Sequence, residues 1–278
     1  MRLDAARNLA KAWLLLLIAC ALPGGLGWAL DGARGASVFV FCVLLAALGV
    51  YAYADRALLG MLGARPCAQA ERPALVATVE RLSGRLGIVP PKLYLIPDGF
   101  PRALTAGRGP RGAALAVSQG LLAALPPAEL EGVLAHELVH IRNRDVLVQT
   151  AAVIIAATLV ELSRIGGWLE RALLFVLAPI AAAIVNLLLS PKRELAADRA
   201  AAALLETPHG LADALVRLEQ ASELIEFAAS PTTEPLYTLN PFAEEGLALM
   251  FSTHPPVARR VERLRGLDPD WRNKLHAV

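Results

Sequence analysis

The sequence predicts an α+β, mainly helical integral membrane protein, in which two transmembrane helical hairpins bracket a water-soluble domain made of two parts. Two observations support this fold class. Hydrophobic residues make up 56% of the 278 residues and the mean hydropathy is +0.50, values too apolar for an ordinary soluble domain. The apolar residues also gather into four segments that approach or reach the length of a bilayer span, with stretches of ordinary polarity beside them.

The first hairpin is expected within residues 1–55. Its spans run from about Ala12 to Leu30 and from about Ala36 to Ala54, and Pro23-Gly24-Gly25 interrupts the first of them. A cleaved signal peptide is the alternative, since Leu17-Ile18-Ala19-Cys20 is similar to a lipoprotein processing site. The second apolar span follows immediately, however, and this favours a helical hairpin.

The second hairpin is expected within residues 146–190, with spans at about Val146–Leu162 and Ala172–Leu189. Basic residues gather at the outer ends of both hairpins: Arg2, Arg7, Lys11, Arg56, Arg65, Arg72, Lys192, Arg193 and Arg199. The short connecting loops hold fewer: Arg34, Arg164 and Arg171. Because basic flanks stay on the cytoplasmic side, we expect a multi-pass protein of the bacterial inner (cytoplasmic) membrane, with its termini and soluble parts in the cytoplasm.

The two soluble parts, residues 56–145 and 191–278, are expected to mix helices and strands. The expected elements are a helix at Pro73–Leu86, strands at Lys92–Ile96 and Ala113–Ser118, a turn-rich stretch at Thr105–Gly112, and a helix at Gly210–Phe227. The net charge of +2, without a basic stripe carrying interleaved aromatic residues, argues against a nucleic-acid partner. Three cysteines provide no disulfide framework, which is consistent with a reducing compartment.

One motif in the first soluble part indicates the chemistry. Residues 136–140 read His136-Glu137-Leu138-Val139-His140, an HExxH string. On a helix, histidines at i and i+4 share one face and can bind one Zn²⁺ at roughly 2.0–2.1 Å. Glu137 then lies about 100° round the helix, beside the metal, where a general base for an attacking water is needed.

The residues around the motif favour a helix over a chance match. The preceding stretch Leu125–Glu131 contains two prolines and two acids, which is typical of the first turn of a helix. Apolar residues then recur at helical spacing at Leu130, Val133, Leu134, Leu138 and Ile141.

A catalytic zinc needs a third protein ligand and an open position for water. The cysteines are poor candidates, because two lie in apolar spans and the third stands alone. Glu194 is the better candidate, and Asp198 would hold a histidine N–H or a neighbouring cation in place. These two carboxylates lie at i and i+4 and would repel each other on a bare helix, which favours a cation facing them. The alternative is a solvated surface whose basic residues compensate both charges.

Three motifs, in order along the chain, carry a family resemblance. They are HELVHIRNRD at 136–145, leading into an apolar span, RELAADRAAA at 193–202 and FSTHPPVARRVERL at 251–264. Together with the placement of the spans, they resemble the HtpX-like membrane zinc metalloproteases, which are related to the CAAX prenyl proteases. The resemblance covers nearly the whole chain. It implies a zincin-like catalytic domain in the cytoplasm and a role in protein quality control and the stress response.

The resemblance also implies the site residues. One Zn²⁺ per chain would be held by His136, His140 and Glu194. Glu137 would be the catalytic base, and His254 would lie near the site and hydrogen-bond the substrate or the oxyanion. Arg260 would pair with Asp198.

Two further expectations concern substrate binding. Where relatives commonly have an Asn-Ala-Phe-type stretch, this chain has Arg102-Ala103-Leu104-Thr105-Ala106-Gly107, so subsite preference should differ if that stretch lines the groove. The strand Ala113–Ser118 is a candidate to receive the substrate backbone by edge pairing. An ordinary buried strand is the alternative.

The motif helix is expected to continue into the third span, because Ile141–Asp145 contains no helix breaker, which places the metal roughly 9 Å of helix from the membrane. The predicted function is a zinc-dependent endopeptidase that hydrolyses peptide bonds of membrane proteins, misfolded ones above all, near the cytoplasmic surface of the lipid bilayer. The flanking charges of Glu129, Glu131, Arg142 and Arg144 argue against cleavage inside the membrane. A proteolytically inactive zinc-binding membrane scaffold is the alternative.

Overall fold

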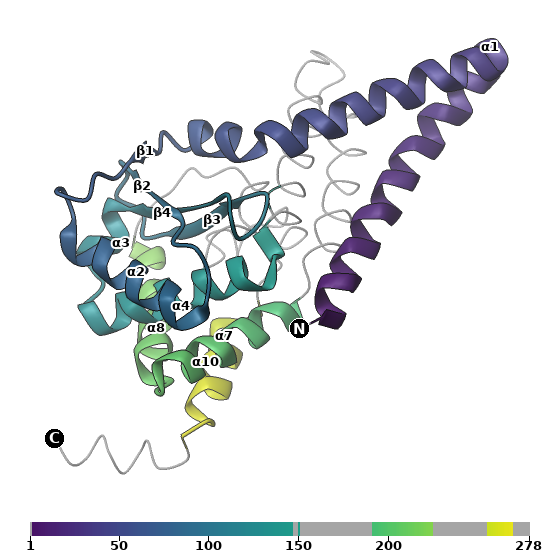
Figure 1. The fold of residues 1–278 in the computed structure, drawn as a ribbon. Coiled ribbons are helices and arrows are strands. Elements are labelled where there is room, and N and C mark those ends of the chain that lie inside the picture. Colours follow the sequence, from purple (N-terminus) through teal and green to yellow (C-terminus); the bar gives the residue numbers. More distant parts are fainter. Residues whose placement is uncertain (1, 147–149, 151–190, 225–254, 269–278) are drawn as a thin grey trace, which may run out of the picture.

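The computed structural model describes residues 2–146, 150, 191–224 and 255–268 (Figure 1). It is a mainly helical α+β fold, as the sequence predicts. The second predicted hairpin, apart from Val146 and Thr150, lies outside the described residues, and so does His254.

The chain begins with the long helix α1, Arg2–Met61, which turns back on itself at Asp31 and Gly32 (Figure 1). Asp31 has φ −148° and ψ 33°, and Gly32 has φ 55° and ψ −140°, a backbone conformation that residues with a Cβ rarely adopt. The two halves touch beside this turn: a Cβ on Gly27 would lie 2.4 Å from the Gly35 carbonyl oxygen. Pro23 stays inside the helix, so Pro23–Gly25 does not interrupt it, and the turn begins directly after the first predicted span, Ala12–Leu30.

Both halves of α1 present large apolar side chains outward. Leu26, Trp28, Leu30 and Phe41 are between 56% and 69% exposed. By length and composition, Pro23–Gly49 is the one stretch among the described residues that is apolar enough to cross a membrane. A core helix of a soluble protein would bury these side chains instead.

A sheet of four strands follows α1, in the order β1-β2-β4-β3. The strands are β1, Arg65–Pro66; β2, Lys92–Ile96; β3, Ala103–Gly107; and β4, Ala113–Ser118. The central pair β2 and β4 is parallel, and the β1–β2 and β3–β4 pairs are antiparallel. The predicted bounds of β2 and β4 are confirmed. The strand β3 was not predicted, because its small residues show no alternation of polar and apolar types.

The position of β4 corrects the expectation about substrate pairing. β4 is bonded to β2 on one side and to β3 on the other, so it is a buried inner strand and has no edge to offer. The edge of the sheet on that side is β3. The alternative interpretation of Ala113–Ser118, an ordinary buried strand, is the correct one.

The sheet separates two apolar cores, because successive residues of a strand point to opposite faces. On one face, Leu115 and Val117 of β4 pack with the helices that follow α1 along the chain. On the other face, Ala114 and Ala116 pack with Leu58 at the end of α1. The sheet is therefore joined to α1 by an apolar contact.

Six further helices complete the described fold. They are α2, Pro73–Leu86; α3, Gln119–Ala124; α4, Pro127–Asn143; α7, Pro191–Leu205; α8, His209–Leu224; and α10, Val257–Arg265. The predicted helix over Pro73–Leu86 is confirmed, and α8 ends within the range expected for Gly210–Phe227. The helix α4 lies at the centre, against α2, α7, α8 and β3. Its Gly132 permits close contact with α8, since a Cβ there would lie 2.6 Å from the Leu211 nitrogen.

The helix α4 does not continue into the third predicted span, so that expectation is wrong. It ends at Asn143, and Arg144 adopts the left-handed conformation, with φ 62° and ψ 27°. The Arg144 N–H bonds the carbonyls of His140 and Ile141, which closes the last turn. Asp145 and Val146 are again helical. The sequence carries no signal for this break, because arginine is not a residue that favours the left-handed region.

Candidate metal centre

The HExxH residues lie in the buried middle of α4. His136, Glu137 and His140 are only 1%, 4% and 2% exposed. Because the histidines are one helical turn apart, both imidazoles project from the same face, and their Nε2 atoms are 3.2 Å apart. Burying two imidazoles and a carboxylate together is unfavourable unless they are paired or bind a metal ion.

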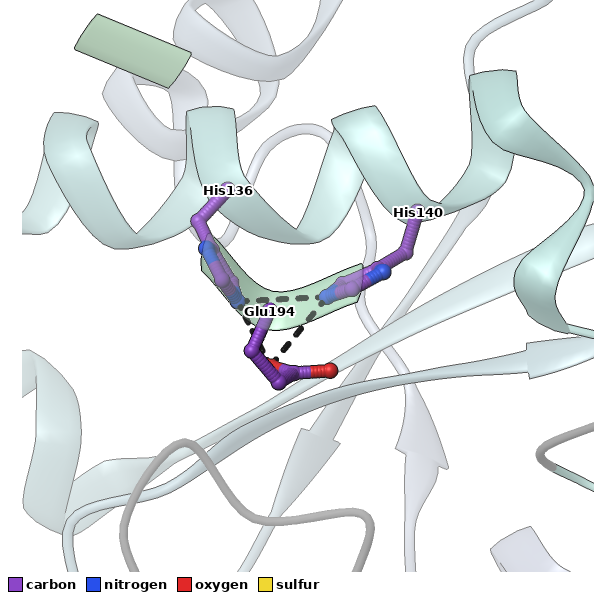
Figure 2. Close-up of side chains that lie close together, drawn as sticks. All are labelled: His136, His140 and Glu194. Carbon is purple, nitrogen blue, oxygen red and sulfur yellow. Dashed lines mark hydrogen bonds and ion pairs between the residues drawn. The ribbon is translucent and has the colours of Figure 1, made fainter. Parts of the chain in front are cut away.

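The helix α7 brings a carboxylate to the two histidines. Glu194 stands in its first turn, and Oε2 of Glu194 lies 3.5 Å from His136 Nε2 and 3.6 Å from His140 Nε2. Figure 2 shows the three side chains converging from the two helices. The alanines Ala197 and Ala201 on α7 are fully buried, and their small side chains permit the close approach to α4.

The His-His-Glu donor set fits a divalent metal ion. Ligand atoms bonded at roughly 2.0–2.1 Å in a tetrahedral arrangement lie about 3.3 Å from each other. The three atoms here are separated by 3.2, 3.5 and 3.6 Å. They are the one such group of buried ligands among the described residues. Three protein ligands leave one position open, as catalytic metal sites require.

The outer face of His136 meets a buried ion pair. Its Nδ1 lies 3.0 Å from Oδ1 of Asp198, one turn beyond Glu194 on α7. Arg260 of α10 donates two hydrogen bonds to this carboxylate, at 2.6 and 2.9 Å, and is completely buried. The structure thus brings the predicted Asp198 and Arg260 together beside the histidine. The solvated surface considered for Glu194 and Asp198 is excluded, since both carboxylates are buried.

Sequence reasoning missed two residues at the site. Asp145 is 3% exposed, and its Oδ2 lies 3.1 Å from Nδ1 of His140. Thr105 of β3 is buried on the face toward α4, close enough to Glu137 to act on the pKa of its carboxyl. Asp145 depends on the unpredicted turn at Arg144, and Thr105 depends on the unpredicted strand β3.

Within Arg102–Gly107, only some side chains face the site. Thr105 lies on the α4 face of the sheet, whereas Leu104 packs on the opposite face against α1. Arg102 is buried and paired with Asp98.

The charges of the site act on one another strongly. Burial alone would lower the pKa of His140, but the carboxylates of Glu194 and Asp145 overcome burial and raise it to about 10. Burial raises the pKa of Glu137. Burial alone would also raise the pKa of Asp198, but Arg260 holds it well below its usual range. Burial therefore favours the neutral form of the Glu137 carboxyl, and Arg260 favours the ionised form of Asp198.

Comparisons with known proteins show the family of this chain. The model of peptidase family M48 matches residues 69–268. A protease HtpX homolog of Pelotomaculum thermopropionicum is 38% identical, and the match covers 94% of this chain and 99% of the relative. A protease HtpX homolog of Pyrococcus abyssi is also 38% identical, over 92% of this chain and 94% of the relative.

Among solved structures, this chain is similar to S. mikatae Ste24p, with a TM-score of 0.49 and 18% identity, over 95% of this chain and 66% of the other. The family match spans both helices that supply the ligands and includes His136, His140 and Glu194. The chain therefore belongs to peptidase family M48 and is a metalloprotease.

Proposed function

We propose that this metalloprotease is a zinc-dependent endopeptidase anchored in the membrane, and that it cuts membrane proteins close to the cytoplasmic surface. The observation that carries the proposal is that His136, His140 and Glu194 converge beside Glu137. Two of these residues, His140 and Glu194, lie a few residues from the two ends of the second predicted hairpin. The proposal has three parts: the metal, the roles of the residues, and the place of cleavage.

Zinc is the metal that best suits the donor set. Two imidazoles and one carboxylate form a three-ligand set typical of catalytic zinc. Zinc in this position would lower the pKa of a coordinated water and polarise the scissile carbonyl. One ion per chain would be held by His136, His140 and Glu194.

Glu137 would act as the general base. Burial raises the pKa of its carboxyl above the ordinary value, so the carboxylate accepts a proton more readily than an exposed one would. Glu137 would take the proton of the attacking water and pass it to the leaving amine. His254 would hydrogen-bond the substrate or the oxyanion. Asp198 and Arg260 would hold the ring of His136 in its orientation.

The proposed place of cleavage follows from the chain path. The second predicted hairpin, residues 146–190, leaves the soluble domain just after Asp145 and returns at Pro191. His140 and Glu194 therefore lie a few residues from its two ends. The end of α1 packs on the opposite face of the sheet, so the second predicted hairpin alone would bring the ligands close to the membrane. This supports cleavage at the bilayer surface, with the soluble parts in the cytoplasm of a bacterial inner membrane.

The substrates would be membrane proteins, misfolded ones above all, cut within their cytoplasmic segments in a quality-control or stress-response role. The alternative, an inactive zinc-binding scaffold, is disfavoured by the intact Glu137 beside the ligands. A scaffold would need the three ligands but no buried general base.

The test uses detergent-purified protein that is stripped of metal and then supplied separately with zinc, magnesium or calcium, with unfolded casein as substrate. Cleavage restored by zinc and not by magnesium or calcium would support the proposal. Cleavage restored equally by magnesium would contradict the choice of zinc. A reconstituted membrane substrate would then map the cuts, and cuts confined to the far side of the bilayer would contradict the proposed topology.

A further inference from the structure

We infer that Asp145 is a positioning residue for the metal ligand His140, and that the left-handed turn at Arg144 exists to bring it there. The inference rests on the proposed function, because it assumes that His140 binds a metal ion. It adds a residue that lies outside the HExxH and ExxxD motifs.

The contact between Asp145 and His140 is buried. Oδ2 of Asp145 lies 3.1 Å from Nδ1 of His140, and both side chains are at most 4% exposed. The other ring nitrogen, Nε2, faces His136 and Glu194. A carboxylate that accepts the Nδ1–H fixes the tautomer whose lone pair is on Nε2. Asp145 therefore presents His140 to the metal position in the form that can bind.

The same arrangement occurs at the other histidine. Oδ1 of Asp198 lies 3.0 Å from Nδ1 of His136, while Nε2 of His136 faces the metal position. The two carboxylates differ in their cationic partners. Arg260 bonds Asp198 at 2.6 and 2.9 Å, whereas Arg193 stands 3.9 Å from Asp145. Each histidine thus has its own carboxylate.

The turn at Arg144 explains how Asp145 reaches His140. On a continuous helix a residue five positions on lies about 140° round the axis, so Asp145 would point away from the face that carries the ligands. The helix instead stops at Asn143, and Arg144 takes φ 62° and ψ 27°. This conformation is disfavoured for residues other than glycine and asparagine. An unfavourable conformation next to a metal ligand is evidence that the turn serves the site.

Arg193 lies close both to Asp145 and to the third proposed ligand, Glu194. Its Nη2 lies 3.5 Å from Oε1 of Glu194, and its Nε lies 3.9 Å from Oδ2 of Asp145. The guanidinium therefore stands between the carboxylate that orients His140 and the carboxylate that completes the donor set. Both ends of the second predicted hairpin contribute to this contact, since Asp145 precedes it and Arg193 follows it.

The experiment measures zinc affinity by competition with a chromophoric chelator, using full-length protein in detergent. Asp145→Asn and Asp145→Ala should weaken zinc binding by roughly 10–100-fold, with alanine at the larger end. They should also change the visible absorption of the cobalt-substituted protein. The matched control is Asp213→Asn, which alters an exposed ion pair with Arg265 and should bind zinc like the unchanged protein.

A second pair of variants tests the turn without touching any ligand or Asp145. Arg144→Gly suits the left-handed conformation and should keep the zinc affinity. Arg144→Val is strongly disfavoured there and should reduce it. This pair keeps the test decisive if the Asp145 variants do not fold.

The outcomes separate the two claims. If the unchanged protein takes up no zinc, the proposed function fails. If it binds zinc and the Asp145 variants bind equally tightly with an unchanged cobalt spectrum, the positioning role alone is overturned. If Arg144→Val and Arg144→Gly bind zinc equally, the role of the turn is overturned.

Discussion

The helix α1 exposes large apolar side chains, whereas the helix α4 buries polar ones. Large apolar side chains of α1, such as Trp28 and Phe41, are more than 60% exposed. In α4 the imidazoles and the carboxylate of the HExxH motif are almost completely buried. Exposed apolar surface requires a lipid or protein environment, and buried polar groups require partners of their own. The difference therefore separates an apolar surface on α1, which needs lipid or protein against it, from a buried group of potential metal ligands on α4.

We expect the largest effect when one of the three buried metal ligands proposed above is removed. Glu194→Ala should lose bound metal and peptidase activity together, by more than the roughly 100-fold that loss of an orienting partner costs. The measurement is metal content by elemental analysis beside casein cleavage. Glu206→Ala is the control, since Glu206 lies just beyond the end of α7 and forms an exposed pair with Arg85. Normal metal content in Glu194→Ala would exclude it as a ligand.

The next effect concerns the fully buried guanidinium of Arg260. Arg260→Met leaves Asp198 charged and without its two strongest hydrogen bonds, so the free energy of unfolding should fall by about 3–5 kcal/mol. Arg265→Met, on the same helix α10, removes a surface pair and should cost about 0–1 kcal/mol. Denaturant unfolding in detergent measures both. Equal stability of the two variants would show that burial of the Asp198 pair is unimportant.

A matched pair of exposed apolar residues tests the environment of α1. Phe41 is 65% exposed in α1, and Val89 is 56% exposed in the soluble domain. If α1 lies in lipid, Phe41→Arg should cost about 2.5–3.5 kcal/mol of insertion, whereas Val89→Arg should change nothing. Resistance to alkaline extraction from membranes is the measurement. Identical behaviour of the two variants would place α1 outside the bilayer.

The smallest expected effect is at the turn of α1. Gly32→Ala forces a side chain into a positive-φ conformation and should lower stability by roughly 1–3 kcal/mol. Gly49→Ala lies inside the helix with no atom within 4 Å of the new Cβ, and should be neutral or slightly stabilising. Thermal unfolding in detergent compares them. A stability loss no larger for Gly32→Ala than for Gly49→Ala would argue against a tight turn at Asp31–Gly32.

Elements with strong local patterns could be predicted from the sequence. The period of apolar residues gives α2 and the helix of the HExxH motif, and apolar runs bounded by turn residues give β2 and β4. The pairing of Glu194 with the two histidines could be predicted because few residue types bind zinc and the motif order restricts the choice.

The features that escaped prediction depend on tertiary contacts. β3 consists mostly of small residues that are buried by α1 and α4, so its own sequence does not indicate a strand. The strand order, which puts β4 inside the sheet, follows from a crossover that no local pattern encodes. Arg144 adopts a conformation that its residue type disfavours, so the position of Asp145 could not be foreseen.

The most direct test of the central claim is a paired measurement on Glu137→Gln, which keeps the shape of the side chain and removes its basicity. We predict one zinc ion per chain in both proteins, equal stability, and a loss of casein cleavage confined to the variant. That result would separate metal binding from proton transfer and assign the second to Glu137. Cleavage retained by Glu137→Gln would contradict the account, because the buried carboxyl would then not be the base.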